Sequence, residues 1–266
     1  MQRVDALSAG ELRAQPELAG VPASGFAAPT VAIFNESTVL TDAQVQPAVA
    51  ALAKQVINDF GPAWGISANV VFVPKGQKPA PEMWQLVILD DSDQAGALGY
   101  HDLTAEGLPM GKVFARTDVV NHLSWSVTIS HELLEMLGDP DINLTAFDQA
   151  TNTTGVLYAY EACDACEADE YGYEIDGILV SDFVMKSWFG PNLPGPYDFK
   201  GHIKKPLEIL PGGYIGVFDV TRGSGWQQKT RENDRSAILS ARRQPRGSRR
   251  ERRSVPRSQW LRSDAR

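Results

Sequence analysis

Residues 126–141 read SVTISHELLEMLGDPD, and this stretch decides how the whole chain is interpreted. Its apolar residues recur at helical spacing, and their number predicts a helix that is buried in the core. Gly138, with Pro140 just beyond it, predicts where that helix ends. His131 and Glu135 are four residues apart, so they lie on the same face of the helix. A buried pair of this kind is costly unless it is hydrogen-bonded, paired or bound to a cation.

The positions of His131 and Glu135 are those of two ligands that hold one metal ion. Glu132 lies between them, beside the ion, where a general base for a bound water belongs. Gly138 follows Glu135 by three residues, and Asp141 follows Gly138 by three. The complete pattern is therefore H-E-x-x-E-x-x-G-x-x-D.

This pattern resembles the signature of the metzincin zinc proteases, H-E-x-x-H-x-x-G-x-x-H, in which Asp replaces the last His in some members. The resemblance implies a zinc ion on His131, Glu135 and Asp141, with Glu132 as the catalytic base. Another group of zinc proteases takes its last ligand from a downstream glutamate, so Glu161 is the alternative third ligand.

Further details follow from the same resemblance. Gly138 would form the turn that ends the helix, for which a tolerance of positive φ suits glycine. Asp139 also follows this glycine, so the identity of the third ligand stays ambiguous. Met185 could form the Met turn that metzincins place beneath the metal, although a lone Met among apolar residues more often fills the core.

Glu135 stands where the resemblance leads us to expect a histidine. Three ligands that include two carboxylates leave a formally neutral zinc site, which makes the metal a weaker Lewis acid than a three-histidine site does. Oxygen ligands also favour harder ions. We therefore expect Zn²⁺, with Mn²⁺ or Ca²⁺ as alternatives.

The segments before this helix alternate between strand and helix patterns. Thr41 is a candidate N-cap for a helix through about residue 60, which Gly61-Pro62 would end. Asn121 or Ser124 would start the next helix, which carries His131 and ends at Gly138. The predicted strands are 31–37, 66–73, 84–90, 97–102 and 111–116. This order is similar to that of metzincins, whose edge strand holds an extended peptide; here that strand would be 97–102.

The second half of the chain is less regular. Residues 157–164 and 173–184 are predicted strands, the latter with an Asp-Gly turn at 176–177. The expected fold class is therefore α+β: a zincin-like, mixed and mostly parallel sheet with two main helices, including the active-site helix, followed by an irregular strand-rich half.

Other polar residues have plainer interpretations. Cys163 and Cys166 form a C-x-x-C pair that we interpret as two thiols or a local disulfide. The single histidines 101, 122 and 202 are more often surface or hydrogen-bonded residues than ligands, and His101 is the first of them to mutate. An acidic cluster is interpreted as a solvated surface, with a structural cation or the basic tail as alternatives; it comprises Glu161, Asp164, Glu167, Asp169, Glu170, Glu174 and Asp176.

Length and charge suggest three segments. The 266 residues suffice for one substantial core or two small ones. We expect a loosely ordered arm at 1–29, a zincin-like metallohydrolase domain at 30–222 and a disordered tail at 223–266. The tail holds 13 Lys and Arg against 4 Asp and Glu, although the net charge of the chain is −8. Such a tail is suited to a polyanion or an acidic protein.

No apolar run reaches the roughly 18 residues of a membrane helix, and the first residues lack the apolar core of a secretory signal. We therefore expect no transmembrane segment and a cytoplasmic location by default, with signal-independent release as an alternative.

The expected function is that of a metal-dependent, peptidase-like hydrolase. The alternatives are a non-catalytic binding or particle-structural module with the same fold, and a metal-dependent hydrolase of non-peptide substrates.

Overall fold

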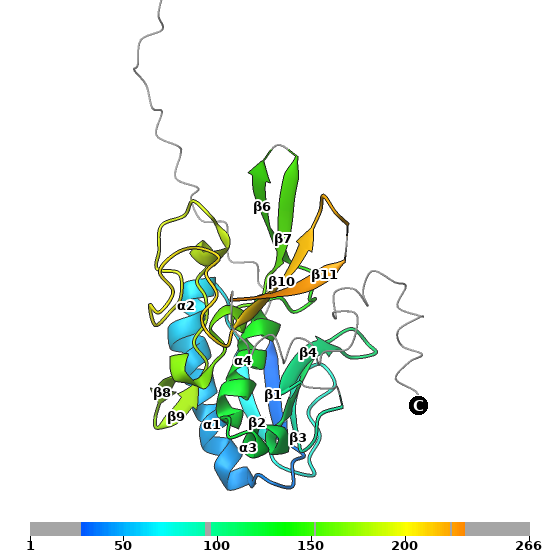
Figure 1. The fold of residues 1–266 in the computed structure, drawn as a ribbon. Helices are drawn as coiled ribbons and strands as arrows, with labels where there is room; N and C mark the ends of the chain where they lie inside the picture. The colour runs from blue at the N-terminus through cyan, green and yellow to red at the C-terminus, as the bar shows by residue number, and fades with distance from the viewer. Residues whose placement is uncertain (1–27, 94–96, 152, 224, 232–266) are drawn as a thin grey trace, which may run out of the picture.

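The computed structural model describes residues 28–93, 97–151, 153–223 and 225–231 (Figure 1). These residues form a five-stranded sheet, a four-stranded sheet, a two-stranded hairpin and several helices. Helix and strand are thus both present in quantity, and the predicted α+β class is confirmed. Residues 1–27, most of the expected N-terminal arm, lie outside the described residues.

The five-stranded sheet is mixed and mostly parallel, as predicted. Its order is β2-β1-β3-β5-β4, and only β4 runs antiparallel to its neighbour. The strands are β1 (Thr30–Asn35), β2 (Asn69–Val73), β3 (Trp84–Leu89), β4 (Gly99–Leu103) and β5 (Pro109–Phe114). Strand β4 lies at the edge, which confirms the edge position predicted for residues 97–102.

The first main helix covers the β1–β2 side of this sheet. Helix α1 (Asp42–Gln55) begins after Thr41, whose backbone N–H donates to the Gln44 side chain at 2.9 Å. The prediction that Gly61-Pro62 ends the helix was wrong. A π-helical turn, η1 (Val56–Phe60), leads into α2 (Gly61–Trp64), and Pro62 fits the first turn of α2 because no N–H is needed there.

The second main helix contacts β3, β4 and β5. It is α4 (Trp125–Gly138), which follows the short helix α3 (Ala115–Val120) and has the predicted Ser124 as its N-cap. Gly138 is the last helical residue and does not adopt a positive φ, so the turn expected of it is absent. Glycine instead lets the Trp64 ring pack closely against the helix, because a Cβ at position 138 would lie 3.2 Å from that ring.

The later part of the chain builds a second sheet, which projects beyond the first (Figure 1). Its antiparallel order is β11-β10-β7-β6, from strands β6 (Thr145–Thr151), β7 (Thr154–Ala159), β10 (Tyr214–Asp219) and β11 (Trp226–Thr230). The strand predicted at 157–164 therefore ends at Ala159. Strand β11 falls within the segment expected to be tail, so ordered chain continues past Gly223; residues 232–266 lie outside the described residues.

A small hairpin packs against both main helices. Its strands are β8 (Tyr173–Ile175) and β9 (Ile178–Val180), and β9 contacts both α1 and α4. The predicted Asp-Gly turn is confirmed, because Asp176 and Gly177 both have positive φ. The remaining described helices are the 3₁₀ turns η2 (Asp164–Cys166), η3 (Asp169–Tyr171) and η4 (Lys186–Phe189). Within the described part of the chain, no helix has both the length and the apolarity needed to cross a bilayer.

Candidate metal centre

Helix α4 supplies three ionisable side chains to the interior. His131, Glu132 and Glu135 are all buried, as the apolar sequence around them predicts. The helical spacing brings His131 Nε2 to 3.2 Å from Glu135 Oε2. Glu132 lies to the side and approaches strand β4 rather than His131.

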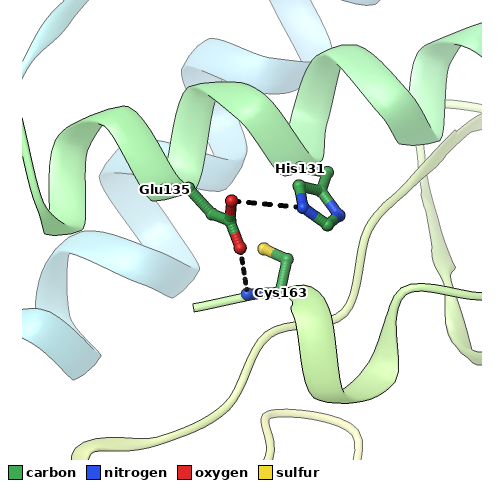
Figure 2. A group of neighbouring side chains, drawn as sticks. All are labelled: His131, Glu135 and Cys163. Carbon is green, nitrogen blue, oxygen red and sulfur yellow. Dashed lines mark hydrogen bonds and ion pairs between the residues drawn. The ribbon is translucent and has the colours of Figure 1, made fainter. Parts of the chain in front are cut away.

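The loop that follows β7 approaches this face of α4. Cys163 donates its backbone N–H to Glu135 Oε1 at 3.1 Å, and Figure 2 shows the Cys163 side chain close to Glu135 and His131. Two further backbone bonds fix the loop from behind, Val184 N–H to Ala162 O at 2.7 Å and Leu210 N–H to Ala165 O at 2.9 Å. The loop is thus held on both sides, which fixes the acidic residues on it.

Asp164 is the acidic residue of this loop that contacts His131. Its Oδ1 lies 3.3 Å from His131 Nε2, on the same ring nitrogen that faces Glu135. His131, Asp164 and Glu167 form one group whose ligand atoms are mutually close enough for one ion, and His131, Glu135 and Cys163 form another. His131 can therefore take its partners from α4 and from the loop.

Strand β4 brings a second imidazole to the same place. His101 is fully buried, with Nδ1 at 3.4 Å from Glu132 Oε2 and 3.7 Å from Glu135 Oε2. Its Nε2 lies 3.8 Å from Glu161 Oε2. Gly99 makes room for this arrangement, because a Cβ there would be 2.8 Å from both Cγ and Oε1 of Glu132. Edge strand, helix and loop thus converge on one cluster.

We call this set the acid–imidazole cluster. Its members are His101, His131, Glu132, Glu135, Glu161 and Asp164.

The carboxylates change the proton affinity of their neighbours. Burial alone would lower the pKa of His131, but the charge of Glu135 and the hydrogen bond to Asp164 outweigh it and raise the pKa well above its ordinary value. Burial, together with the charge of Glu135, raises the pKa of Asp164 to about 7. In the metal-free protein, protons therefore offset part of the negative charge, and a bound cation would compete with them.

The donor set suits a divalent metal ion. Imidazole and carboxylate groups are the ligands that zinc and manganese sites use, and four carboxylates buried together without a cation are costly. His131 and Glu135 would hold the ion from one helix face, with Asp164 or Glu161 from the loop. Zn²⁺, with Mn²⁺ or Ca²⁺ as alternatives, stays a prediction.

The structure separates the predicted third ligands. Asp141 is exposed beyond the end of α4 and joins none of the candidate metal-binding groups in the described part of the chain. Asp139 is buried, and its carboxylate accepts the backbone N–H groups of Asn143 and Leu144. Glu161 is buried within the acid–imidazole cluster. Met185 is the N-cap of η4 and packs against the hydrophobic core; its role as a Met turn stays a prediction.

Sequence reasoning missed several members of the site. The solvated-surface interpretation was wrong for Glu161 and Asp164, which are buried, although Glu170, Glu174 and Asp176 are exposed. The neighbouring Cys163 and Cys166 offered a local signal, since cysteine is among the most buried residue types. Both are free thiols, and burial raises their pKa values well above the usual range.

A separate group, Asp182, Asp198 and His202, lies on the later loops. Local hydrogen bonds explain its carboxylates: Asp182 Oδ1 accepts from the N–H groups of Phe183 and Lys200, while Asp198 accepts from His202 and Ile203. These bonds fasten the loop, and His202 Nδ1 lies 3.3 Å from Asp182 Oδ2. His122 is exposed.

Comparisons of the chain with protein-family models, with curated proteins and with solved structures give no match.

Proposed function

We propose that this protein is a zincin-like, metal-dependent hydrolase whose centre is the acid–imidazole cluster. One observation supports this most: two imidazoles and four carboxylates, from α4, β4 and one loop, converge in a buried place. The proposed ligands are His131 and Glu135, with Glu161 or Asp164 in the third position. Asp141 is less suited because it is exposed.

Zinc bound there would act as a Lewis acid toward a carbonyl group and lower the pKa of a water molecule. Glu132 is the residue that would accept the proton of that water and return it to the leaving group. Its Oε2 lies 3.4 Å from His101 Nδ1, so His101 would orient this carboxylate. Glu132 Oε2 and Glu135 Oε2 face the same nitrogen, His101 Nδ1, at 3.4 and 3.7 Å, so the candidate base lies on the Glu135 side of the ligand pair.

A peptide is the proposed substrate. Strand β4 is at the edge of the sheet and contributes His101 to the cluster, so a chain lying along β4 would pass the candidate base. An edge strand offers backbone groups for pairing with an extended peptide. Access is narrow, because His131, Glu132 and Glu161 keep only 8%, 5% and 7% of their surface exposed.

That narrow access favours a second candidate function, a non-catalytic module that retains the fold. In such a module the polar cluster would hold a structural cation or share protons. The absence of turnover by metal-loaded wild-type protein on a broad peptide library would favour this second function.

The decisive variant is Glu132→Gln, which keeps the shape of the side chain and removes its basicity. We expect metal content and thermal stability close to wild type and a fall in turnover of about 10²- to 10⁴-fold, the usual contribution of a general base. Glu82→Gln makes the same chemical change at an exposed site and is the matched control. Wild-type turnover in Glu132→Gln would refute the proposed role of Glu132.

A further inference from the structure

Glu135 lies between two imidazoles rather than beside one. Its Oε2 is 3.2 Å from His131 Nε2 and 3.7 Å from His101 Nδ1, while its Oε1 accepts the backbone N–H of Cys163. Glu135 also belongs to two candidate metal-binding groups, one with His131 and one with His101 and Glu161. It is thus common to two sets of donors that come from different elements.

The distances are those of ligands that share an ion. Two ligands that each lie about 2.1 Å from one ion are about 3.4 Å apart at the tetrahedral angle, and at most about 4.2 Å apart. The distances from His131 Nε2 to Glu135 and Asp164, 3.2 and 3.3 Å, fall in that range, as does the 3.8 Å from His101 Nε2 to Glu161 Oε2. Glu135 Oε2 faces the other ring nitrogen of His101, and its place beside a second ion is supported by the group of His101, Glu135 and Glu161, whose ligand atoms are mutually close enough for one ion. Direct charge-assisted hydrogen bonds are shorter, at about 2.7–2.9 Å.

One ion does not account for the whole set. Among the described residues, each candidate group near α4 contains either His131 or His101, and none contains both. The donors divide into a His131 side, with Asp164, and a His101 side, with Glu161. Glu135 contacts both histidines, because its Oε2 lies near His131 Nε2 and near His101 Nδ1.

Charge points the same way. Glu132, Glu135, Glu161 and Asp164 are all buried and amount to four negative charges when ionised. One divalent cation leaves two of these charges to be offset by protons, because unpaired charges are costly in a place with little access to water. Two divalent cations balance all four.

We infer that the centre binds a pair of divalent cations, Zn²⁺ or Mn²⁺, with the Glu135 carboxylate shared between them. His131 and Asp164 hold one ion, and His101 and Glu161 hold the other. On His101, Nε2 faces Glu161 and would bind the ion, while Nδ1 faces the Glu132 carboxylate at 3.4 Å. This arrangement is usual for metal-bound histidine. The inference takes the metal centre of the proposed function as its starting point, but it does not depend on turnover.

The test is a count of bound metal. Full-length protein is stripped, reloaded with Zn²⁺ or Mn²⁺, desalted and measured by elemental analysis, with calorimetric titration as a second count. We expect two equivalents in the wild type and one each in His101→Ala and His131→Ala. Two Mn²⁺ ions bridged at a separation of about 4 Å should also give an exchange-coupled EPR spectrum, which either substitution abolishes.

His122→Ala and His202→Ala are the controls and should keep two equivalents. The His202 variant also shows that the second ion is not held by the Asp182–Asp198 group. If His101→Ala does not fold, Glu161→Gln replaces it as the variant that should bind one equivalent. The number of metal ions bound by the wild type tests the inference without any variant.

One equivalent in the wild type, or an unchanged count in His101→Ala, would overturn the inference while leaving a single-metal hydrolase intact. Two coupled ions without turnover on any substrate would instead uphold the inference and refute the proposed function.

Discussion

At the scale of single residues, Gly99 controls where the candidate base sits. A Cβ at this position would be 2.8 Å from the Glu132 side chain and 3.0 Å from the backbone oxygen of Lys112. The carboxylate of Glu132 would therefore have to move, since the backbone of β5 yields less easily.

We accordingly predict that Gly99→Ala lowers turnover by roughly 10²-fold, the effect of displacing a catalytic group by about 1 Å. Metal content should stay close to wild type, because Glu132 belongs to none of the candidate metal-binding groups. Steady-state kinetics and elemental analysis on the same sample measure the two effects. Unchanged turnover in a folded Gly99→Ala variant would contradict the position assigned to Glu132.

Some of these residue positions follow from the sequence and others do not. Helical periodicity was enough to predict that His131 and Glu135 share a buried face, and the structure has them 3.2 Å apart. No local pattern could join His101 or Asp164 to them, because those contacts connect residues that are about 30 positions apart in the chain. The spacing of Gly138 and Asp141 correctly indicated the end of the helix, but it did not place Asp141 at the site, because that residue is exposed to solvent.

At the scale of elements, a buried carboxyl group joins α3 to α4. Asp118 Oδ1 accepts a hydrogen bond from Thr128 Oγ1 at 3.1 Å, and its Oδ2 has no hydrogen-bond partner among the described residues. Burial raises the pKa of Asp118 to about 7, against the lowering effect of the Thr128 hydrogen bond. Folded protein thus keeps this carboxyl protonated over a range in which the unfolded chain ionises.

The sign of the pH dependence follows from that difference. Between pH 4 and pH 7 the folded state binds more protons at Asp118, so the free energy of unfolding falls as the pH rises. We predict that Asp118→Asn removes this loss, which for a shift of this size amounts to about 4 kcal/mol in all and to roughly 2 kcal/mol between pH 5 and pH 7. Urea unfolding at pH 5 and pH 7 measures it; equal pH slopes in variant and wild type would contradict the assignment.

Elements with strong local signals were predictable, and those without were not. Thr41 and Ser124 marked helix starts, and the β-branched runs marked the strands of the first sheet, whose cores are fully buried at Ile33 and Ile88. Among the described side chains, β6 has none that is fully buried and β10 has Ile215 alone, so the pairing of these strands depends on neighbours from distant parts of the chain. The order of elements favours a zincin-like fold, and that remains a proposal.

At the scale of the whole molecule, bound metal should contribute to stability. A ligand that binds only the folded state raises the free energy of unfolding by RT ln(1 + [L]/Kd), or about 4 kcal/mol per site when free metal is 1,000 times Kd. We predict that chelation lowers the melting temperature and that Zn²⁺ or Mn²⁺ restores it. The same measurement on His131→Ala should show a smaller shift, and an identical melting temperature with and without metal in the wild type would contradict a metal centre.

The loop that supplies Glu161 and Asp164 also has a consequence for biosynthesis. Its backbone is fastened from behind by Leu210, while the first sheet and α4 are complete by residue 138. During translation, at about 5–20 residues per second, the earlier part is synthesised several seconds before Leu210. We therefore expect His101, His131 and Glu135 to lack their loop partners in the nascent chain until the later residues have been made. The order of synthesis would then make metal binding a late event in the maturation of the protein.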